Sequence, residues 1–250
     1  MDARRRAPRI GVLVGISFAA SYLLTSAAPQ AHMGSGVVVH PPTCRSRSDC
    51  GPRIMGGLQI TFTGWSCTTG FVARDSQTRQ LYVLTAGHCL AGSGVSALWS
   101  HHGASFGRAT AEAFHPGSVA DVGEIEVAGP ATSDEIYGPS NADIRRLTGS
   151  APNASQTVGS EVCRSGVTSG WRCGSIVAAD VDTTLLGTLI RHTWWTDFPS
   201  ASGDSGAPIV DHDGRAAGIL IATTSTQSVY STVDWIATEL HTRACVDSEC

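Results

Sequence analysis

The sequence predicts an all-β protein, a barrel or sandwich of many short strands with one helix near its C-terminal end. Short apolar runs bounded by turn residues recur from residue 54 onward, which is typical of strands at regular spacing. The chain holds 28 glycines and 11 prolines, a composition that favours turns over long helices. With 250 residues, 42% of them hydrophobic, it can bury a substantial core.

Five apolar runs are the clearest strand candidates. They cover residues 71–73, 81–84, 125–127, 176–178 and 208–210. Asp211 to Gly214 separate the last run from residues 216–222, which predicts a hairpin with its turn near Asp213-Gly214.

One helix is predicted over residues 232–240. Its apolar residues repeat at i, i+3, i+4 and i+7, namely Val233, Ile236, Ala237 and Leu240. Thr232 is expected to cap its start, and Asp234 in the first turn suits the helix dipole.

Residues 1–28 are expected to be a secretory signal peptide. Four arginines within the first nine residues precede an apolar stretch over 10–24, and small residues follow at 26–28. That stretch is short for a membrane span and polar residues interrupt it, which disfavours the alternative of a retained anchor. We therefore expect a secreted, extracellular protein that is free of the membrane once the signal is removed.

Residues 29–53 are rich in proline, glycine and serine and are expected to form an extended lead-in. The formal net charge of −4 is mild and no dense basic patch follows the first residues, so nucleic acid is not expected as a partner. We expect a monomer without a cofactor.

Eight cysteines in an exported chain predict disulfides. None of their spacings is C-x2-C, so no metal site is expected.

The first segment that suggests chemistry runs from Leu84 to Cys89 and reads LTAGHC. It should place His88 on a tight glycine-containing turn at the end of an apolar strand. An imidazole titrates near neutrality, so it can take a proton from a hydroxyl and return it to a leaving group. A histidine by itself is more often an ordinary surface or core residue.

The second segment runs from Gly203 to Pro208 and reads GDSGAP. Its glycines allow a sharp turn that exposes the Ser205 hydroxyl and brings backbone N–H groups together, as a developing oxyanion requires. Taken alone, this string is equally compatible with an ordinary turn.

The third segment begins at Asp121 and continues into the alternating strand pattern of residues 122–127. A carboxylate here could accept the second imidazole N–H and fix its tautomer. This signal is the weakest of the three, because aspartate before a strand is common.

The three segments together resemble the chymotrypsin-like serine proteases, which share the order His, Asp, Ser. The intervals of 33 and 84 residues are similar to those of the bacterial branch, the streptogrisin and α-lytic protease type. Further similar segments lie at residues 54–57, 67–71, 162–166 and 171–174, so the resemblance covers about residues 54–240.

The resemblance implies two six-stranded antiparallel β-barrels with a C-terminal helix. Residues 54–147 would form the first barrel with His88 and Asp121, and residues 148–250 the second, with Ser205, the helix and a cysteine-containing tail. The implied function is that of a secreted serine endopeptidase, which hydrolyses proteins or peptides through an acyl-enzyme on Ser205. The alternatives are a catalytically weak, protease-like binding module and, third, an esterase of another fold.

The resemblance also implies bridges Cys67–Cys89 and Cys163–Cys173, and an oxyanion hole formed by the N–H groups of Gly203 and Ser205. The remaining four cysteines allow three pairings. We expect the local pairs over crossed ones, namely Cys44 with Cys50 and Cys245 with Cys250.

Two cations compete for Asp204, the carboxylate beside the nucleophile. Cleavage after Arg53 would free an Ile54 ammonium that could pair with it. Arg164, however, matches the arginine that has this role in the bacterial branch, and a guanidinium is always charged. We expect a buried Asp204–Arg164 ion pair and activity that needs no free Ile54 terminus.

The chain departs from the family in three places. No cysteine lies in residues 194–202, so the third family bridge is missing, and Ala207 stands where glycine is usual. Residues 220–224 replace a Ser-Gly-Gly-like substrate edge. Pro199 lies where basic-specific relatives carry a carboxylate, so we expect small or apolar side chains at the cleaved position.

Overall fold

The computed structural model describes residues 44–51, 53–127, 132–140 and 143–246. These residues belong to one unit, residues 31–250. The expected signal peptide and much of the expected lead-in lie outside the described residues. Among the described residues, none of the helices has the length and apolar character needed to span a bilayer.

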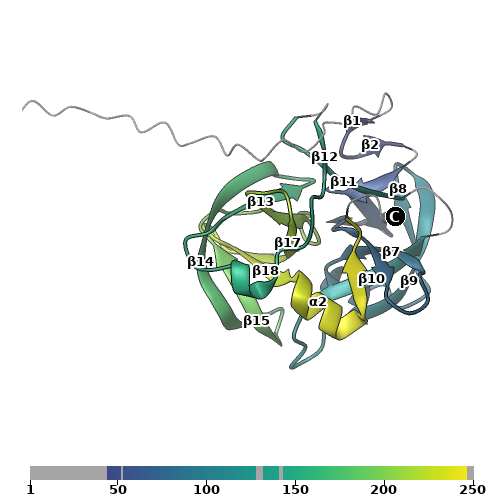
Figure 1. Ribbon diagram of the computed structural model, residues 1–250. Coiled ribbons are helices and arrows are strands. Elements are labelled where there is room, and N and C mark those ends of the chain that lie inside the picture. Colours follow the sequence, from purple (N-terminus) through teal and green to yellow (C-terminus); the bar gives the residue numbers. More distant parts are fainter. Residues whose placement is uncertain (1–43, 52, 128–131, 141–142, 247–250) are drawn as a thin grey trace, which may run out of the picture. The chain divides into compact units, whose positions relative to one another are not determined.

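The all-β fold is confirmed, and Figure 1 labels its elements. The strands before residue 150 are β1 (Cys44–Ser46), β2 (Asp49–Cys50), β3 (Ile54–Gly56), β4 (Gln59–Phe62), β5 (Trp65–Thr68), β6 (Val72–Asp75), β7 (Leu81–Thr85), β8 (Leu98–His101), β9 (Ala104–Ala113), β10 (Val122–Val127), β11 (Thr132–Tyr137) and β12 (Ile144–Arg146). The later strands are β13 (Glu161–Gly166), β14 (Gly170–Leu185), β15 (Thr188–Thr196), β16 (Pro208–Asp211), β17 (Ala216–Thr223), β18 (Ser228–Thr232) and β19 (Thr242–Ala244). The helices are α1 (Gly87–Ala91), the 3-10 turn η1 (Asn153–Ser155) and α2 (Val233–Leu240).

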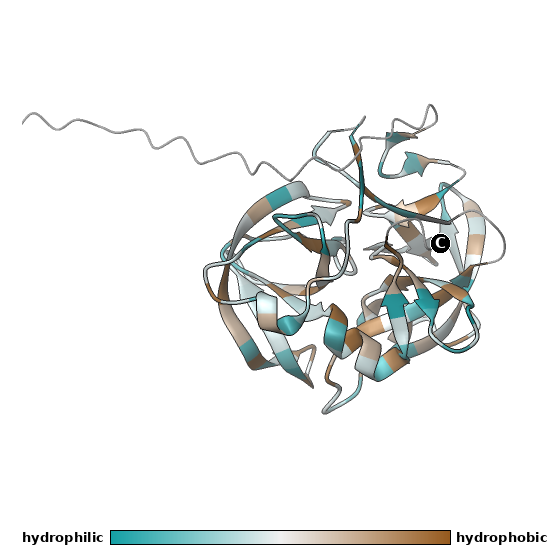
Figure 2. Ribbon diagram, viewed as in Figure 1, coloured by the Kyte–Doolittle hydropathy of each residue, from teal (hydrophilic) through white to brown (hydrophobic). Residues whose placement is uncertain are grey.

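The second half closes into the expected six-stranded antiparallel barrel, in the order β13-β14-β15-β18-β17-β16. Its interior is filled by buried side chains that include Val162, Ile209 and Tyr230. The expected hairpin is present, because β16 pairs with β17 and Gly214 adopts a left-handed φ of 78° in the turn. Figure 2 shows hydrophobic and hydrophilic segments alternating along strands of both halves, as one-sided burial requires.

The first half differs from the expected six strands in its strand count. Its main sheet has eight strands in the order β19-β6-β7-β10-β9-β8-β4-β5, and β12, β11 and β3 form a further sheet. The additional strand β19 comes from the far end of the chain and pairs antiparallel with β6. The C-terminal tail therefore covers an edge that the first half would otherwise expose.

The expected extended lead-in is wrong for residues 44–50, which form a β-hairpin. β1 and β2 pair antiparallel, and a disulfide joins Cys44 to Cys50 across them. Composition misled the prediction, because serine is favoured in turns as well as in linkers.

The predicted C-terminal helix is confirmed as α2. Thr232 occupies its N-cap position without a side-chain capping bond, so that part of the prediction is wrong. Asp234 does lie in the first turn, where its Oδ2 accepts the Asn153 N–H at 2.8 Å. The helix contacts β17 and β18 of the barrel as well as β9 and β19 of the first half, so it links the two.

Glu124 gives the stability of the sheet a dependence on pH. This carboxyl lies on β10 with 6% of its surface exposed, and its Oε1 has no hydrogen-bond partner among the described residues. Burial raises the pKa of Glu124 from 4.5 to about 7. The folded protein thus holds this proton more tightly than the unfolded chain does, so the contribution of Glu124 to stability declines between about pH 4.5 and 7.

We predict that Glu124→Gln raises the Tm relative to wild type at pH 8 but has little effect at pH 4. A gain of ~1 kcal/mol would appear as about 2–4 °C. Thermal unfolding at both pH values measures this, with the exposed Glu126→Gln as the matched control on the same strand. Equal shifts at the two pH values, or the same behaviour in the control, would contradict it.

Candidate active site

His88 and Asp121 form a closely bonded pair. The His88 Nδ1 lies 2.6 Å from Asp121 Oδ2, and Asp121 Oδ1 accepts the backbone N–H of His88 at 2.8 Å. The Asp121 side chain is fully buried, whereas 14% of the His88 side chain is exposed. Because the carboxylate accepts the proton on Nδ1, Nε2 is left with the lone pair that a general base needs.

Strand pairing brings these two residues together. β7 pairs antiparallel with β10, with Thr85 opposite Gly123, so the residues just beyond each strand end lie side by side. His88 is carried by the short helix α1, where the sequence suggested a tight turn. A side chain at Gly87 would meet the Val122 carbonyl at 2.7 Å, so only glycine allows this close approach.

Two neighbours of the pair were not singled out from the sequence for this role. The Ser231 Oγ accepts the Asp121 N–H at 2.9 Å. The Phe114 ring meets His88 edge-on, with the ring centroids 5.8 Å apart. Phe114 and Ser231 lie far from the motifs in sequence, so only the folded chain shows their contribution.

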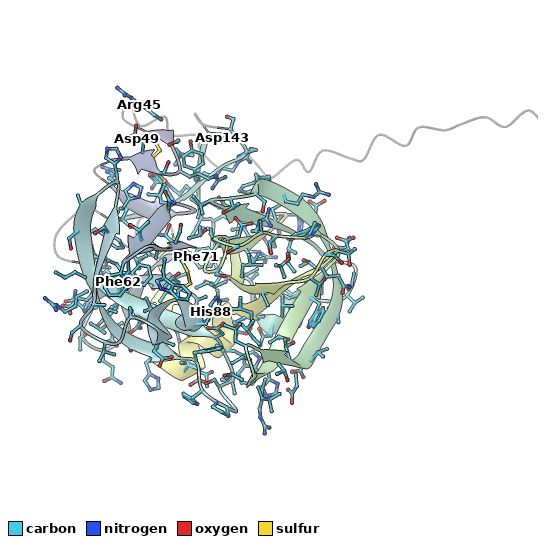
Figure 3. The ribbon with its side chains drawn as sticks, turned by 180° about the vertical axis from the view of Figure 1, so that it is seen from behind. Arg45, Asp49, Phe62, Phe71, His88 and Asp143 are labelled. Atoms are coloured by element: carbon cyan, nitrogen blue, oxygen red, sulfur yellow. A yellow bond between two sulfur atoms is a disulfide. The ribbon has the colours of Figure 1, made fainter. Side chains whose placement is uncertain are left out.

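The Ser205 turn is fastened to the first half by Thr68. The Thr68 N–H donates to the Ser205 carbonyl at 2.8 Å, and its Oγ1 donates to the Gly203 carbonyl at 2.7 Å. Gly206 has a φ of 89°, and a Cβ there would overlap Thr68 O and Thr85 Oγ1. The turn therefore lies against the end of β7, just before the segment that carries His88. Figure 3 shows His88 where the strands of the two halves meet.

Two N–H groups in this turn are available to a ligand. Those of Asp204, Gly206 and Ala207 donate to backbone carbonyls, whereas those of Gly203 and Ser205 have no acceptor within the described part of the chain. These two are the expected oxyanion donors. The Ser205 hydroxyl likewise makes no hydrogen bond to His88 among the described residues, and such bonds often form fully only with substrate.

Asp204 is buried beside Ser205 and lies 3.4 Å from the Arg164 guanidinium, both side chains having no exposed surface. The contact is not bidentate, because only Nη1 reaches the carboxylate. Nη1 also donates to the Pro199 carbonyl at 3.0 Å and Nη2 to the Gly170 carbonyl at 3.5 Å. Asp204 in addition accepts the N–H groups of Thr168, Ser169 and Ala201 and the Ser169 hydroxyl. Burial lowers the pKa of Arg164, and the Asp204 charge opposes that decrease.

Ile54, the competing candidate partner of Asp204, lies elsewhere. It is 4% exposed within β3, which pairs parallel with β11, and packs in the core of the first half. In this structure Arg164 faces the carboxylate.

Disulfides join several of the segments that form this site. The structure contains Cys67–Cys89, which joins β5 to the His88 helix, and Cys163–Cys173, which joins β13 to β14. Cys245 is also disulfide-bonded. Cys250 lies outside the described residues, so its pairing stays a prediction. In the segment without the third bridge, Trp194 is buried and donates to the Gln156 carbonyl at 2.8 Å.

We predict that Arg164→Ala destabilises the protein by roughly 3–5 kcal/mol, because it leaves the Asp204 carboxylate buried without its cation. Denaturant unfolding measures the loss. Arg172→Ala is the matched control, since Arg172 lies directly opposite Arg164 in the β13–β14 pairing and is exposed. Equal stability of the two variants would show that the pair does not stabilise the turn.

The protein family described as Trypsin matches the chain over residues 53–237. Streptogrisin-A of Streptomyces griseus is 33% identical over 159 residues, which cover 63% of this chain and 48% of the relative. Glutamyl endopeptidase 2 of the same organism is 30% identical over 155 residues, covering 61% of this chain and 77% of the relative. The chain thus spans about half the length of Streptogrisin-A.

The crystal structure of Thermobifida fusca protease A has the same fold, with a TM-score of 0.67. It is 23% identical, and the match covers 78% of this chain and 100% of that one. The family match, the curated relatives and the all-β fold agree with one another. The chain therefore belongs to the trypsin family, the chymotrypsin-like serine proteases, and resembles its bacterial members.

Proposed function

We propose that the chain is a secreted serine endopeptidase that cleaves protein or peptide substrates through an acyl-enzyme on Ser205. The observation that carries this proposal is the 2.6 Å contact between His88 Nδ1 and the fully buried Asp121 carboxylate, on the side of the molecule where the Ser205 turn is fastened. A structural histidine has no need of a buried carboxylate that leaves its second nitrogen free.

In the first step, the Ser205 hydroxyl gives its proton to His88 Nε2 while its oxygen attacks the carbonyl carbon of the substrate. The carbonyl electrons move to oxygen, and the N–H groups of Gly203 and Ser205 stabilise the resulting charge. When the C–N bond breaks, the imidazolium returns the proton to the leaving amine. Water then hydrolyses the ester by the same proton transfers.

Asp121 supports this chemistry in two ways. It holds the imidazole in the tautomer with the proton on Nδ1, and it stabilises the imidazolium that forms when His88 takes the serine proton. Its second oxygen is bonded to the His88 backbone, so the carboxylate fixes the position of the ring as well as its charge.

Secretion is part of the proposal. The N-terminal sequence has the features of a signal peptide, and no described cysteine is free, as suits an oxidising compartment. The alternative is a protease-like binding module with little turnover, which would need neither the His88–Asp121 pair nor free N–H donors beside Ser205.

Substitution of the triad separates these functions. We expect Ser205→Ala and His88→Ala to abolish hydrolysis of casein and peptide esters, and Asp121→Asn to lower kcat by about 10⁴. Folding should be retained, as thermal unfolding would show. Exposed Ser155→Ala is the control, since its hydroxyl bonds only within the η1 turn. Wild-type turnover in Ser205→Ala would refute the mechanism, and an inactive wild type would favour the binding module.

The segment just before Ser205 is hydrogen-bonded to neutral groups of the barrel. The Thr223 Oγ1 accepts the Ser200 N–H at 3.0 Å, and the Ser228 hydroxyl lies 3.1 Å from Ser200 Oγ. The nearby carboxylate of Asp197 is engaged elsewhere, because its Oδ1 accepts the Ser175 N–H on β14 at 2.7 Å. These bonds support a site bordered by uncharged groups.

We therefore predict cleavage after small or apolar residues, because among the described residues near Ser200 the Asp197 carboxylate is bonded to β14 and would not compensate a buried charged side chain of the substrate. Profiling with a peptide library measures the preference. A dominant preference for arginine or lysine would contradict the prediction. So would a dominant preference for glutamate, the residue named in the relative Glutamyl endopeptidase 2.

A further inference from the structure

The hairpin β1–β2 precedes residue 53, where the family match begins, yet it contributes a side chain to the interior between the two halves. That side chain is Arg47, in the turn of the hairpin. The hairpin's own disulfide, Cys44–Cys50, joins two residues that both precede Arg53.

The Arg47 guanidinium donates hydrogen bonds to three segments of the chain. Its Nη1 donates to the Gly57 carbonyl at 3.0 Å and to the Ser165 Oγ at 2.6 Å. Its Nη2 donates to the Gly138 carbonyl at 2.9 Å. The guanidinium also lies over the Tyr137 ring, 4.4 Å from its centroid. One side chain thus ties the hairpin to the strands of the first half and to β13 of the barrel.

Burial of this cation has an electrostatic consequence. Desolvation lowers the pKa of Arg47 to about 10, and the charges of Tyr137 and Asp204 oppose the decrease, while Arg164 adds to it. Arg47 therefore stays charged at neutral pH. It interacts electrostatically with Asp204 and Arg164, the ion pair beside Ser205.

The contact with Ser165 leads directly to the Ser205 turn. Ser165 is fully buried and lies between Arg164, the cation of Asp204, and Gly166. A Cβ on Gly166 would overlap the Asp204 carboxylate, so the backbone of β13 packs against that carboxylate without spare room. A displacement of Ser165 must therefore move the groups that hold Asp204, which is the neighbour of Ser205.

A second attachment fixes the base of the hairpin. His101 at the end of β8 is 6% exposed, and its Nε2 lies 2.6 Å from the Cys50 carbonyl, its Nδ1 2.7 Å from the Gln59 carbonyl. The hairpin is therefore fastened at both its turn and its base.

We propose that Arg47 is a positioning residue for the Ser205 turn and that the hairpin of residues 44–50 is a permanent part of the active enzyme. This proposal rests on the proposed function. It is the opposite of an activation peptide, because loss of the hairpin would remove the Arg47 contacts and lower activity. A cut after Arg53 would leave the hairpin held without a covalent link, since Cys44–Cys50 does not cross that bond.

The test uses the full chain with Arg47→Gln, Arg47→Lys and, as matched control, Arg45→Gln. Arg45 lies on the same hairpin but is exposed, and Figure 3 shows it pointing outward. We expect Arg47→Gln to lower kcat at least tenfold, towards the ~10²-fold loss that a 1 Å displacement costs, with a smaller change in KM. Arg47→Lys should recover part of kcat, and Arg45→Gln should match wild type.

Hydrogen exchange of the amides in residues 163–169 and 199–206 provides a readout that does not need activity. We expect faster exchange there in Arg47→Gln than in Arg45→Gln. If wild type proves inactive while this difference is present, the proposed function fails and the positioning role stands. Equal kcat and equal exchange in the two variants would overturn the proposal.

Ser165→Ala keeps the test decisive if Arg47→Gln does not fold. It removes the acceptor on β13 and leaves the Gly57 and Gly138 contacts of Arg47 in place. A loss of kcat in the same direction supports the positioning role, and wild-type kcat and exchange in this variant contradict it.

Discussion

The candidate active site depends on the contact between Thr68 and the Ser205 turn, because the proposed catalytic residues come from two different β structures. His88 and Asp121 belong to the first half, whereas Ser205 belongs to the barrel. The Thr68 bonds to the Gly203 and Ser205 carbonyls hold the Ser205 turn against the first half, and the absence of a side chain at Gly206 leaves room for this approach. The proposed nucleophile and the proposed base therefore lie on segments that these bonds join.

Buried charge is the second constraint on this site. Asp204 is enclosed with Arg164, and Arg47 enters the same region from the N-terminal hairpin. A buried carboxylate is costly unless donors and cations surround it. In this structure the N–H groups of Thr168, Ser169 and Ala201 and the Arg164 guanidinium surround Asp204, and Arg47 adds a positive charge nearby.

The sequence predicted those parts of the fold and site that short motifs encode. The triad residues lie in glycine-containing segments beside apolar strands, the hairpin before β17 has its turn residues, and α2 has a regular apolar face. The helix that carries His88 and the lack of a side-chain capping bond at Thr232 were not predicted. Local geometry at both places follows from packing rather than from residue preference.

Long-range contacts set the limit of what the sequence could predict. Thr68, Ser231 and His101 acquire their roles from partners distant in the chain. No local sequence pattern around a threonine, serine or histidine identifies such a distant partner. The pairing of β19 with β6 and the attachment of Arg47 to β13 are of the same kind. In each case one end of the chain completes a part of the structure that is far away in sequence.

Active-site labelling tests the central claim, that this chain assembles a working nucleophile, most directly. A fluorophosphonate reacts with a serine whose hydroxyl is activated by a neighbouring base and whose oxyanion donors are in place. Mass spectrometry of the purified, labelled protein should find one label per chain, on the peptide that contains Ser205. An unlabelled protein, or a label on another residue, would contradict the account.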